Sequence, residues 1–137
     1  MTRRILLTGA SGCIGHYISE TLIQHSGDEL FLLVRDPARL KILTDTRADV
    51  QLVQGDLQDL ESLSELLPTI THAVLTATAW GGPEVVYRIN VDQTLSLIQS
   101  LNPAICEQVI YFSTASILGR EGKLLPEAKA LGTDYIR

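Results

Sequence analysis

Short apolar runs alternate with segments of helical periodicity along the chain. Five runs have the length and composition of buried strands, at residues 4–8, 29–34, 50–54, 71–77 and 108–113. Between them apolar side chains recur every three or four residues, which predicts helices over residues 13–26, 36–43, 59–67 and 84–101. Regular strand–helix alternation with short connections is typical of an α/β domain, with a parallel sheet and right-handed crossovers.

Local signals set the expected ends and faces of these helices. The first should stop at Gly27 and bury a face made of Ile14, Tyr17, Ile18 and Leu22. Pro37 suits the first turn of the second helix, and Asp59 can cap the third, which Pro68 would end. The fourth should stop at Asn102-Pro103 and bury Val85, Ile89, Leu95 and Ile98.

Three glycines mark the first strand-to-helix turn. Gly9, Gly12 and Gly15 follow a strand and open an amphipathic helix, in a G-x-x-G-x-x-G spacing one residue longer than the G-x-G-x-x-G fingerprint. A helix N-terminus offers free N–H groups and partial positive charge, and glycine lets a diphosphate approach the backbone. Residues 9–15 are therefore expected to hold the pyrophosphate of NAD or NADP. Pattern alone allows a flavodoxin-like order, 2-1-3-4-5, but the glycine loop favours the Rossmann order, 3-2-1-4-5.

The residue that ends the second strand bears on the choice of dinucleotide. An acid there would bind the ribose 2′-hydroxyl of NAD, whereas an arginine suits the 2′-phosphate of NADP. The strand ends in Arg35, and Arg39 follows one helical turn later. Asp36 is the competing candidate for the ribose. The sequence thus favours NADP, with NAD as the alternative.

Composition narrows the class of protein. The chain has 137 residues, 45% hydrophobic and 20% charged, which suits one packed domain spanning residues 1–137. A net charge of −5 argues against a nucleic-acid partner, and no apolar stretch is long enough for a membrane span. Cys13 and Cys106 have no metal-ligand spacing, and neither have the three histidines, so we expect no metal site and a cytoplasmic protein with reduced thiols.

Five motifs in order give the chain a family resemblance. Residues 8–15 match T-G-x-x-G-x-[IL]-G, and residues 87–94 match Y-x-x-N-V-x-x-T. Three more segments resemble motifs of the same family and follow at suitable intervals: the turns at 55–57 and 77–79 and the strand end at 109–119. The chain resembles an extended or atypical short-chain dehydrogenase/reductase, of the NAD-dependent epimerase/dehydratase family.

The resemblance implies a set of cofactor contacts. The loop residues Ser11, Cys13 and Ile14 would join the three glycines at the pyrophosphate. Asp56, beside Leu57, would meet the adenine amino group. The small turn Ala77, Thr78 and Ala79 would lie against the nicotinamide ribose, and Asn90 would support the nearby backbone.

The resemblance also implies a catalytic set. Thr114 aligns with the Ser or Thr that holds the substrate oxygen, and Tyr135 with the tyrosine that exchanges a proton during hydride transfer. The substrate would be a sugar nucleotide or a related small carbonyl compound, and a homodimer through the helix at 84–101 is a possible assembly. The alternative for the Thr114 hydroxyl is that it merely ends a strand.

The chain stops at Arg137, two residues before the lysine that should follow Tyr135 by four. The C-terminal strands and substrate domain of the family are therefore expected to be missing, either because this is part of a longer protein or because the gene is truncated. Tyr-Ile-Arg could begin the Tyr-x-x-x-Lys helix, which favours the first explanation. The rival function is a non-catalytic dinucleotide-binding module. Without the further strands, the fifth strand should expose apolar surface.

The loop at residues 80–83, Trp-Gly-Gly-Pro, is open to two interpretations. It follows the fourth strand, where it could cover the nicotinamide, or it is an ordinary surface turn.

Overall fold

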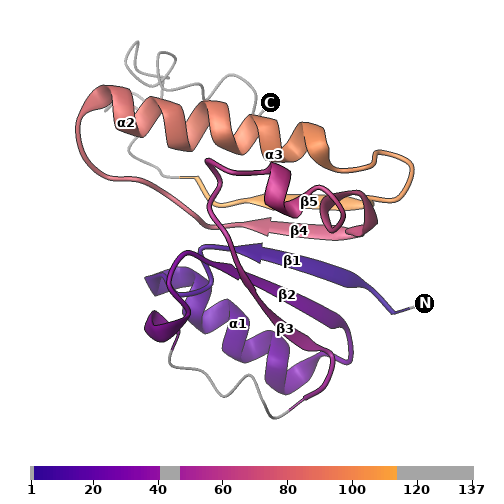
Figure 1. The fold of residues 1–137 in the computed structure, drawn as a ribbon. Helices are drawn as coiled ribbons and strands as arrows, with labels where there is room; N and C mark the ends of the chain where they lie inside the picture. Colours follow the sequence, from indigo (N-terminus) through magenta and orange to yellow (C-terminus); the bar gives the residue numbers. More distant parts are fainter. Residues whose placement is uncertain (1, 41–46, 114–137) are drawn as a thin grey trace, which may run out of the picture.

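The computed structural model describes residues 2–40 and 47–113, so the expected catalytic pair, Thr114 and Tyr135, lies outside the described residues. Five parallel strands form one sheet in the order β3-β2-β1-β4-β5 (Figure 1). The strands are β1 (Arg4–Thr8), β2 (Glu29–Val34), β3 (Val50–Gln54), β4 (His72–Leu75) and β5 (Gln108–Tyr111). This Rossmann-type order confirms the prediction and excludes the flavodoxin-like alternative.

Helices cover both faces of the sheet. α1 (Cys13–His25) lies on one face, and α2 (Pro83–Tyr87), the π-helical η4 (Arg88–Gln93) and α3 (Thr94–Ser100) follow one another along the other (Figure 1). Strand side chains alternate between the two layers. Leu6, Phe31, Leu33 and Leu75 pack with Leu97 and Leu101, and Ile5, Leu7, Leu30 and Leu32 pack with Ile23 of α1.

The buried face of α1 agrees with the predicted one at Ile18 and Leu22, which pack against the core, and differs from it at Ile14 and Tyr17. Gly15, Ser19 and Ile23 are buried, while Ile14 is 51% and Tyr17 is 67% exposed. Two small residues one turn apart let the helix approach the sheet closely, and this rotates the larger Ile14 and Tyr17 outward. The predicted stop at Gly27 is also corrected: Ser26 is the C-cap, in extended conformation, and its N–H donates to Leu22 O over 2.9 Å.

The helix predicted over residues 59–67 does not form. In its place are two 3-10 turns, η2 (Glu61–Leu63) and η3 (Leu67–Thr69), with Pro68 inside the second. Asp59 caps neither turn. The leucines at 57, 60, 63 and 66 recur every third residue, and such side chains align on a 3-10 turn. Leu57 and Leu63 are buried, so this spacing fixes the segment against the sheet.

The segment predicted as one helix over 84–101 is continuous but changes pitch. Its middle turn, η4, is π-helical, and the Thr94 hydroxyl donates to Ile89 O, five residues back, over 3.1 Å. The wider turn shifts the helix phase, so the buried residues are Val91, Thr94, Leu97 and Leu101. The predicted face was therefore wrong at Val85, which is 37% exposed.

Three further elements are shorter than predicted. The helix expected at 36–43 begins as a 3-10 turn, η1 (Pro37–Arg39), capped by the Asp36 carboxylate, which accepts from Ala38 N over 3.1 Å. β4 spans four of the seven predicted positions, and β5 spans four of six. Val109 and Ile110 of β5 are 38% and 43% exposed, as expected for this strand.

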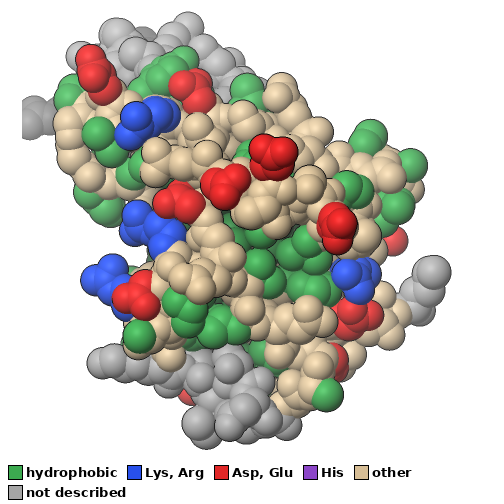
Figure 2. All heavy atoms as spheres, in the orientation of Figure 1, with side chains coloured by type: hydrophobic (Ala, Val, Ile, Leu, Met, Phe, Trp, Pro, Cys, Tyr) green, Lys and Arg blue, Asp and Glu red, His purple; other side chains and the backbone are tan. Residues whose placement is uncertain are grey.

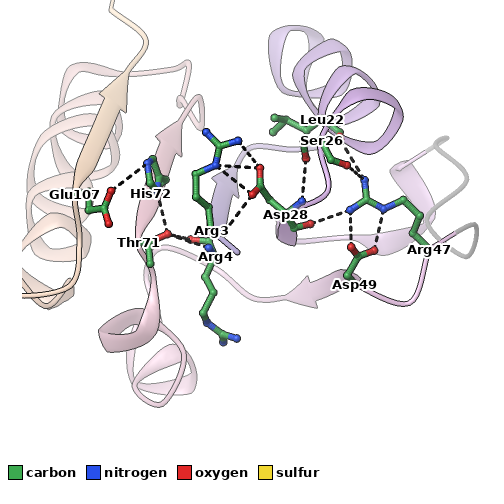
Figure 3. Close-up of polar contacts among 10 residues, drawn as sticks. All are labelled: Arg3, Arg4, Leu22, Ser26, Asp28, Arg47, Asp49, Thr71, His72 and Glu107. Carbon is green, nitrogen blue, oxygen red and sulfur yellow. Dashed lines mark hydrogen bonds and ion pairs between the residues drawn. The ribbon is translucent and has the colours of Figure 1, made fainter. Parts of the chain in front are cut away.

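Ion pairs gather where β1 begins and β2 follows α1 (Figure 3). The Arg3 guanidinium donates to both carboxylate oxygens of Asp28, at 2.8–3.1 Å. Arg47 pairs with Asp49 and donates to the carbonyl oxygens of four residues at the end of α1, namely Leu22, Ile23, Ser26 and Asp28. These contacts satisfy the last carbonyl groups of α1 and place positive charge at its negative end.

Candidate dinucleotide-binding site

The glycine loop makes a tight turn between β1 and α1. Gly9 has φ +69°, and the Gly12 N–H donates to Gly9 O over 2.9 Å. Gly12 is the N-cap of α1 and makes no side-chain cap hydrogen bond, and the first turn of α1 contains no acidic residue. The first N–H groups of α1 therefore have neither an internal partner nor a side-chain substitute. They form a donor surface with partial positive charge.

Two of the three glycines are required by packing within the protein. A Cβ at Gly15 would lie 2.1 Å from Gly9 O, and a Cβ at Gly9 would lie 2.8 Å from the Ala77 backbone. At Gly12 the nearest atom, Gly9 O, would be 3.1 Å away, and the residue is exposed. Gly9 and Gly15 thus hold the loop and α1 together, while Gly12 faces outward at the helix end.

Threonines join the glycine loop to the end of β4. The Thr76 hydroxyl donates to Thr8 O over 2.7 Å, and Ala77 N donates to the Thr8 hydroxyl over 3.3 Å. Neither threonine was among the predicted site residues. The signal that could have found them is a threonine where each of two neighbouring strands ends.

Asn90 holds the turn after β4. Its Oδ1 accepts from Ala79 N over 2.8 Å, and its Nδ2 donates to Ala79 O over 3.3 Å. Asn90 lies in the π turn η4, which brings this amide to the carboxyl edge of the sheet. Ala77, Thr78 and Ala79, predicted to line the nicotinamide side, are thereby fixed at both ends, and Thr78 between them is exposed.

The turns after β2 and β3 lie on the opposite side of the glycine loop from the turn after β4. Arg35 is exposed directly after β2, and the neighbouring Asp36 carboxylate is engaged in capping η1. Asp56, after β3, accepts from Gln58 N over 3.0 Å through Oδ1. The side chain of Leu57 is part of the core, so only its backbone is available to a ligand.

Arginines divide between the two edges of the sheet. Arg3, Arg4 and Arg47, near the start of the strands, all pair with carboxylates. In the described part of the chain, Arg35, Arg39 and Arg88 form no ion pair. The strands run to the left in Figure 1, and most blue side chains in view lie along the left border of the same face in Figure 2. Asp36 follows β2 together with Arg35, and Asp56 follows β3, so charges of both signs lie at the carboxyl edge.

This arrangement fits a dinucleotide. The uncapped end of α1 lies between a turn that carries Arg35 and Asp56 and a turn that Asn90 holds. A dinucleotide has its anionic pyrophosphate between two nucleosides, and here the donors of α1 likewise lie between the turns after β2 and β3 and the turn after β4. Among residues 2–40 and 47–113 no group of His, Cys, Asp and Glu could hold a metal ion. No helix in the described part is long and apolar enough to cross a membrane.

Comparisons with known proteins agree with this geometry. The sequence model of the NAD dependent epimerase/dehydratase family matches residues 5–136. The dTDP-glucose 4,6-dehydratase of Mycobacterium tuberculosis is 28% identical over 107 residues, covering 72% of this chain and 32% of that protein. The chain therefore spans about a third of this curated relative.

Solved structures share the fold. DesIV, a dTDP-glucose 4,6-dehydratase from Streptomyces venezuelae solved with NAD bound, superposes with a TM-score of 0.79 at 24% identity, over 93% of this chain and 48% of that one. WbmH from Bordetella bronchiseptica, in complex with NAD+, gives 0.78 at 19% identity, over 99% and 52%. The family match covers nearly the whole sequence, and the chain belongs to the NAD dependent epimerase/dehydratase family.

Proposed function

We propose that the chain binds NADP or NAD at residues 9–15 and is the cofactor-binding part of an enzyme that transfers a hydride on a sugar nucleotide. The observation that carries the proposal is the uncapped N-terminus of α1, held against the carboxyl ends of β1 and β4 by the contacts of Gly9 and Gly15. Family membership supports the same reading, and so do relatives whose names specify NAD and nucleotide sugars.

The proposal assigns a separate role to each group of the site. The N–H groups at the start of α1 hold the pyrophosphate, and the Asp56 carboxylate accepts from the adenine amino group. Asn90 fixes Ala79, so that the turn at 77–79 presents a constant wall to the nicotinamide ribose. The bound cofactor supplies a carbon that accepts or donates hydride. By the family resemblance, the Thr114 hydroxyl holds the substrate oxygen and Tyr135 exchanges the proton with it.

Titration calorimetry tests the binding. We expect NAD+, NADP+ or both to bind the parent chain, and Gly12→Val to abolish binding, because its branched side chain stands where the pyrophosphate approaches. Gly27→Val is the matched control, since a Cβ at Gly27 has no atom within 4 Å and the residue lies at the opposite end of α1. Circular dichroism checks that both variants fold. Unchanged binding in a folded Gly12→Val variant would place the pyrophosphate elsewhere.

We further propose that NADP is preferred. The Arg35 guanidinium has no ion-pair partner among the described residues, whereas the Asp36 carboxylate already caps η1. Arg35→Ala should weaken NADP+ binding roughly 10- to 100-fold, as expected for a hydrogen bond to a charged group, and leave NAD+ binding unchanged. Arg88→Ala, which removes another exposed arginine, is the control. Tighter binding of NAD+ by the parent chain would assign the ribose to Asp36 instead.

A further inference from the structure

Trp80 is the most exposed large hydrophobic residue of the described chain, at 91%. A single exposed apolar side chain is ordinary on a protein surface. Trp80 differs from such residues because the backbone just before it is held by hydrogen bonds. The residue before it, Ala79, has both backbone polar groups bound by Asn90, so the indole starts from a fixed point.

The segment after Trp80 consists of two glycines with open space around them. Gly81 has φ +145°, and added Cβ atoms at Gly81 and Gly82 would meet no atom within 4 Å. The chain is fixed again where the Gly82 carbonyl accepts the first hydrogen bonds of α2, from Val85 N and Val86 N. Gly81 therefore lies between two positions whose backbone is hydrogen-bonded, Ala79 and Gly82, and Trp80 is the large aromatic residue next to it.

The sheet order shows which part of a ligand Trp80 can reach. Arg35 and Asp56 follow β2 and β3, so the adenosine half of a dinucleotide lies on that side of β1. The nicotinamide half must then extend toward β4, the next strand on the other side. A Cβ at Gly9 would touch Ala77, and three extended residues from Ala77 span at most about 10 Å. Trp80 therefore lies within about 10 Å of Ala77, in the segment that follows β4.

We propose that the Trp80 indole closes over the nicotinamide half of the bound dinucleotide and favours its oxidised form. The inference rests on the proposed dinucleotide site. The oxidised nicotinamide ring carries a positive charge and the reduced ring is neutral. The face of an indole attracts a cation, and more strongly than the face of any other aromatic side chain. Trp80 would therefore bind the oxidised cofactor more tightly than the reduced one, in addition to stacking on either.

The test compares oxidised and reduced cofactor in Trp80→Ala, Trp80→Phe and the control Ile105→Ala, an exposed apolar residue that precedes β5. Calorimetry should show NADP+ binding weakened about 3- to 30-fold in Trp80→Ala, and NADPH binding weakened by a smaller factor. Trp80→Phe should recover part of the loss. ADP-ribose and its 2′-phosphate lack the nicotinamide, and both should bind the parent and Trp80→Ala chains equally.

The fluorescence of Trp80 gives a readout that does not depend on turnover, since the chain has a single tryptophan. Its emission should fall on addition of NADP+ and stay constant with the ADP-ribose ligands. The role of Trp80 would be overturned if Trp80→Ala weakened the binding of oxidised and reduced cofactor by the same factor, or weakened the binding of the ADP-ribose ligands as much as that of NADP+. Either result would leave the proposed dinucleotide site intact. Failure of every ligand to bind the parent chain would overturn both proposals.

Discussion

The side chain of Asn90 serves Ala79 as a neighbouring strand would, accepting from its N–H and donating to its carbonyl oxygen. β4 ends at Leu75, so Ala79 lies beyond the ladder of the sheet. A backbone that leaves a sheet usually finds its partners in solvent or in a further turn. Here an amide on a helix takes their place, and it fixes the turn that is proposed to face the ligand.

Asn90→Ala should loosen that turn. The loss of two hydrogen bonds to a half-buried backbone is expected to lower the free energy of unfolding by about 1–2 kcal/mol and to weaken dinucleotide binding. Urea unfolding and calorimetry measure the two effects. Asp92→Ala, an exposed change in the same π turn, is the control. Unchanged affinity in Asn90→Ala would show that the turn at 77–79 does not contact the ligand.

Gly15→Ala should damage the fold itself. Its Cβ would lie 2.1 Å from Gly9 O, a backbone atom that cannot move without displacing β1, so we expect a loss of at least about 3 kcal/mol in urea unfolding. Gly27→Ala adds the same methyl group to open space and should be neutral or slightly stabilising. Similar midpoints for the two variants would contradict the close packing of α1 on the glycine loop.

Cys13 offers a chemical footprint of the site. It is exposed at the first position of α1, where the pyrophosphate is proposed to lie. Saturating NADP+ or NAD+ should slow its alkylation by iodoacetamide, measured by mass spectrometry of the digested chain. Cys106 is the internal control: burial raises the pKa of its thiol, so it should react slowly, and at a rate that ligand does not change. An unprotected Cys13 would argue against the proposed position of the pyrophosphate.

Asp28 should make stability depend on pH. Hydrogen bonds from Arg3 hold the pKa of this carboxyl below its usual value, so the pair stabilises the fold above about pH 4 and is lost as pH falls through the lowered pKa. Asp28→Asn should cost roughly 1 kcal/mol at pH 7, and the difference from the parent should shrink toward pH 2. Asp59→Asn is the control, since Asp59 caps no helix or turn. A difference that stays constant with pH would show that the charge of Asp28 is not involved.

Much of the fold was readable from the sequence because it depends on local spacing. The buried strands form continuous apolar runs, and the glycine spacing selected the sheet order that the structure shows. The motif at 87–94 indicated that Asn90 supports nearby backbone, and the structure shows its hydrogen bonds with Ala79, while its place in a cofactor site stays a prediction. The roles assigned to Thr114 and Tyr135 lie outside the described residues and stay predictions.

The predictions that were wrong concern helices whose geometry departs from a fixed period of about 3.6 residues, or whose buried face is made of small residues. The threefold leucine spacing predicts an α-helix over residues 59–67, but the segment forms 3-10 turns. The π turn changed the phase of a helix in mid-course, so residues after it face the core in a different register. On α1 the small side chains Gly15 and Ser19 help to decide which face is buried, and the pattern of large apolar residues does not include them.

The two ends of α1 differ in one further respect. Arg47 satisfies the carbonyl groups at its C-terminus, whereas its N-terminal amides have no side-chain cap. A bound pyrophosphate would then act as the missing cap, and ligand affinity would appear directly as conformational stability, growing with the logarithm of ligand concentration. Amide deuterium exchange would show this as a local effect. Cofactor would slow exchange at residues 13–15, while residues 23–25, held within the helix that Arg47 closes, would be protected with or without it.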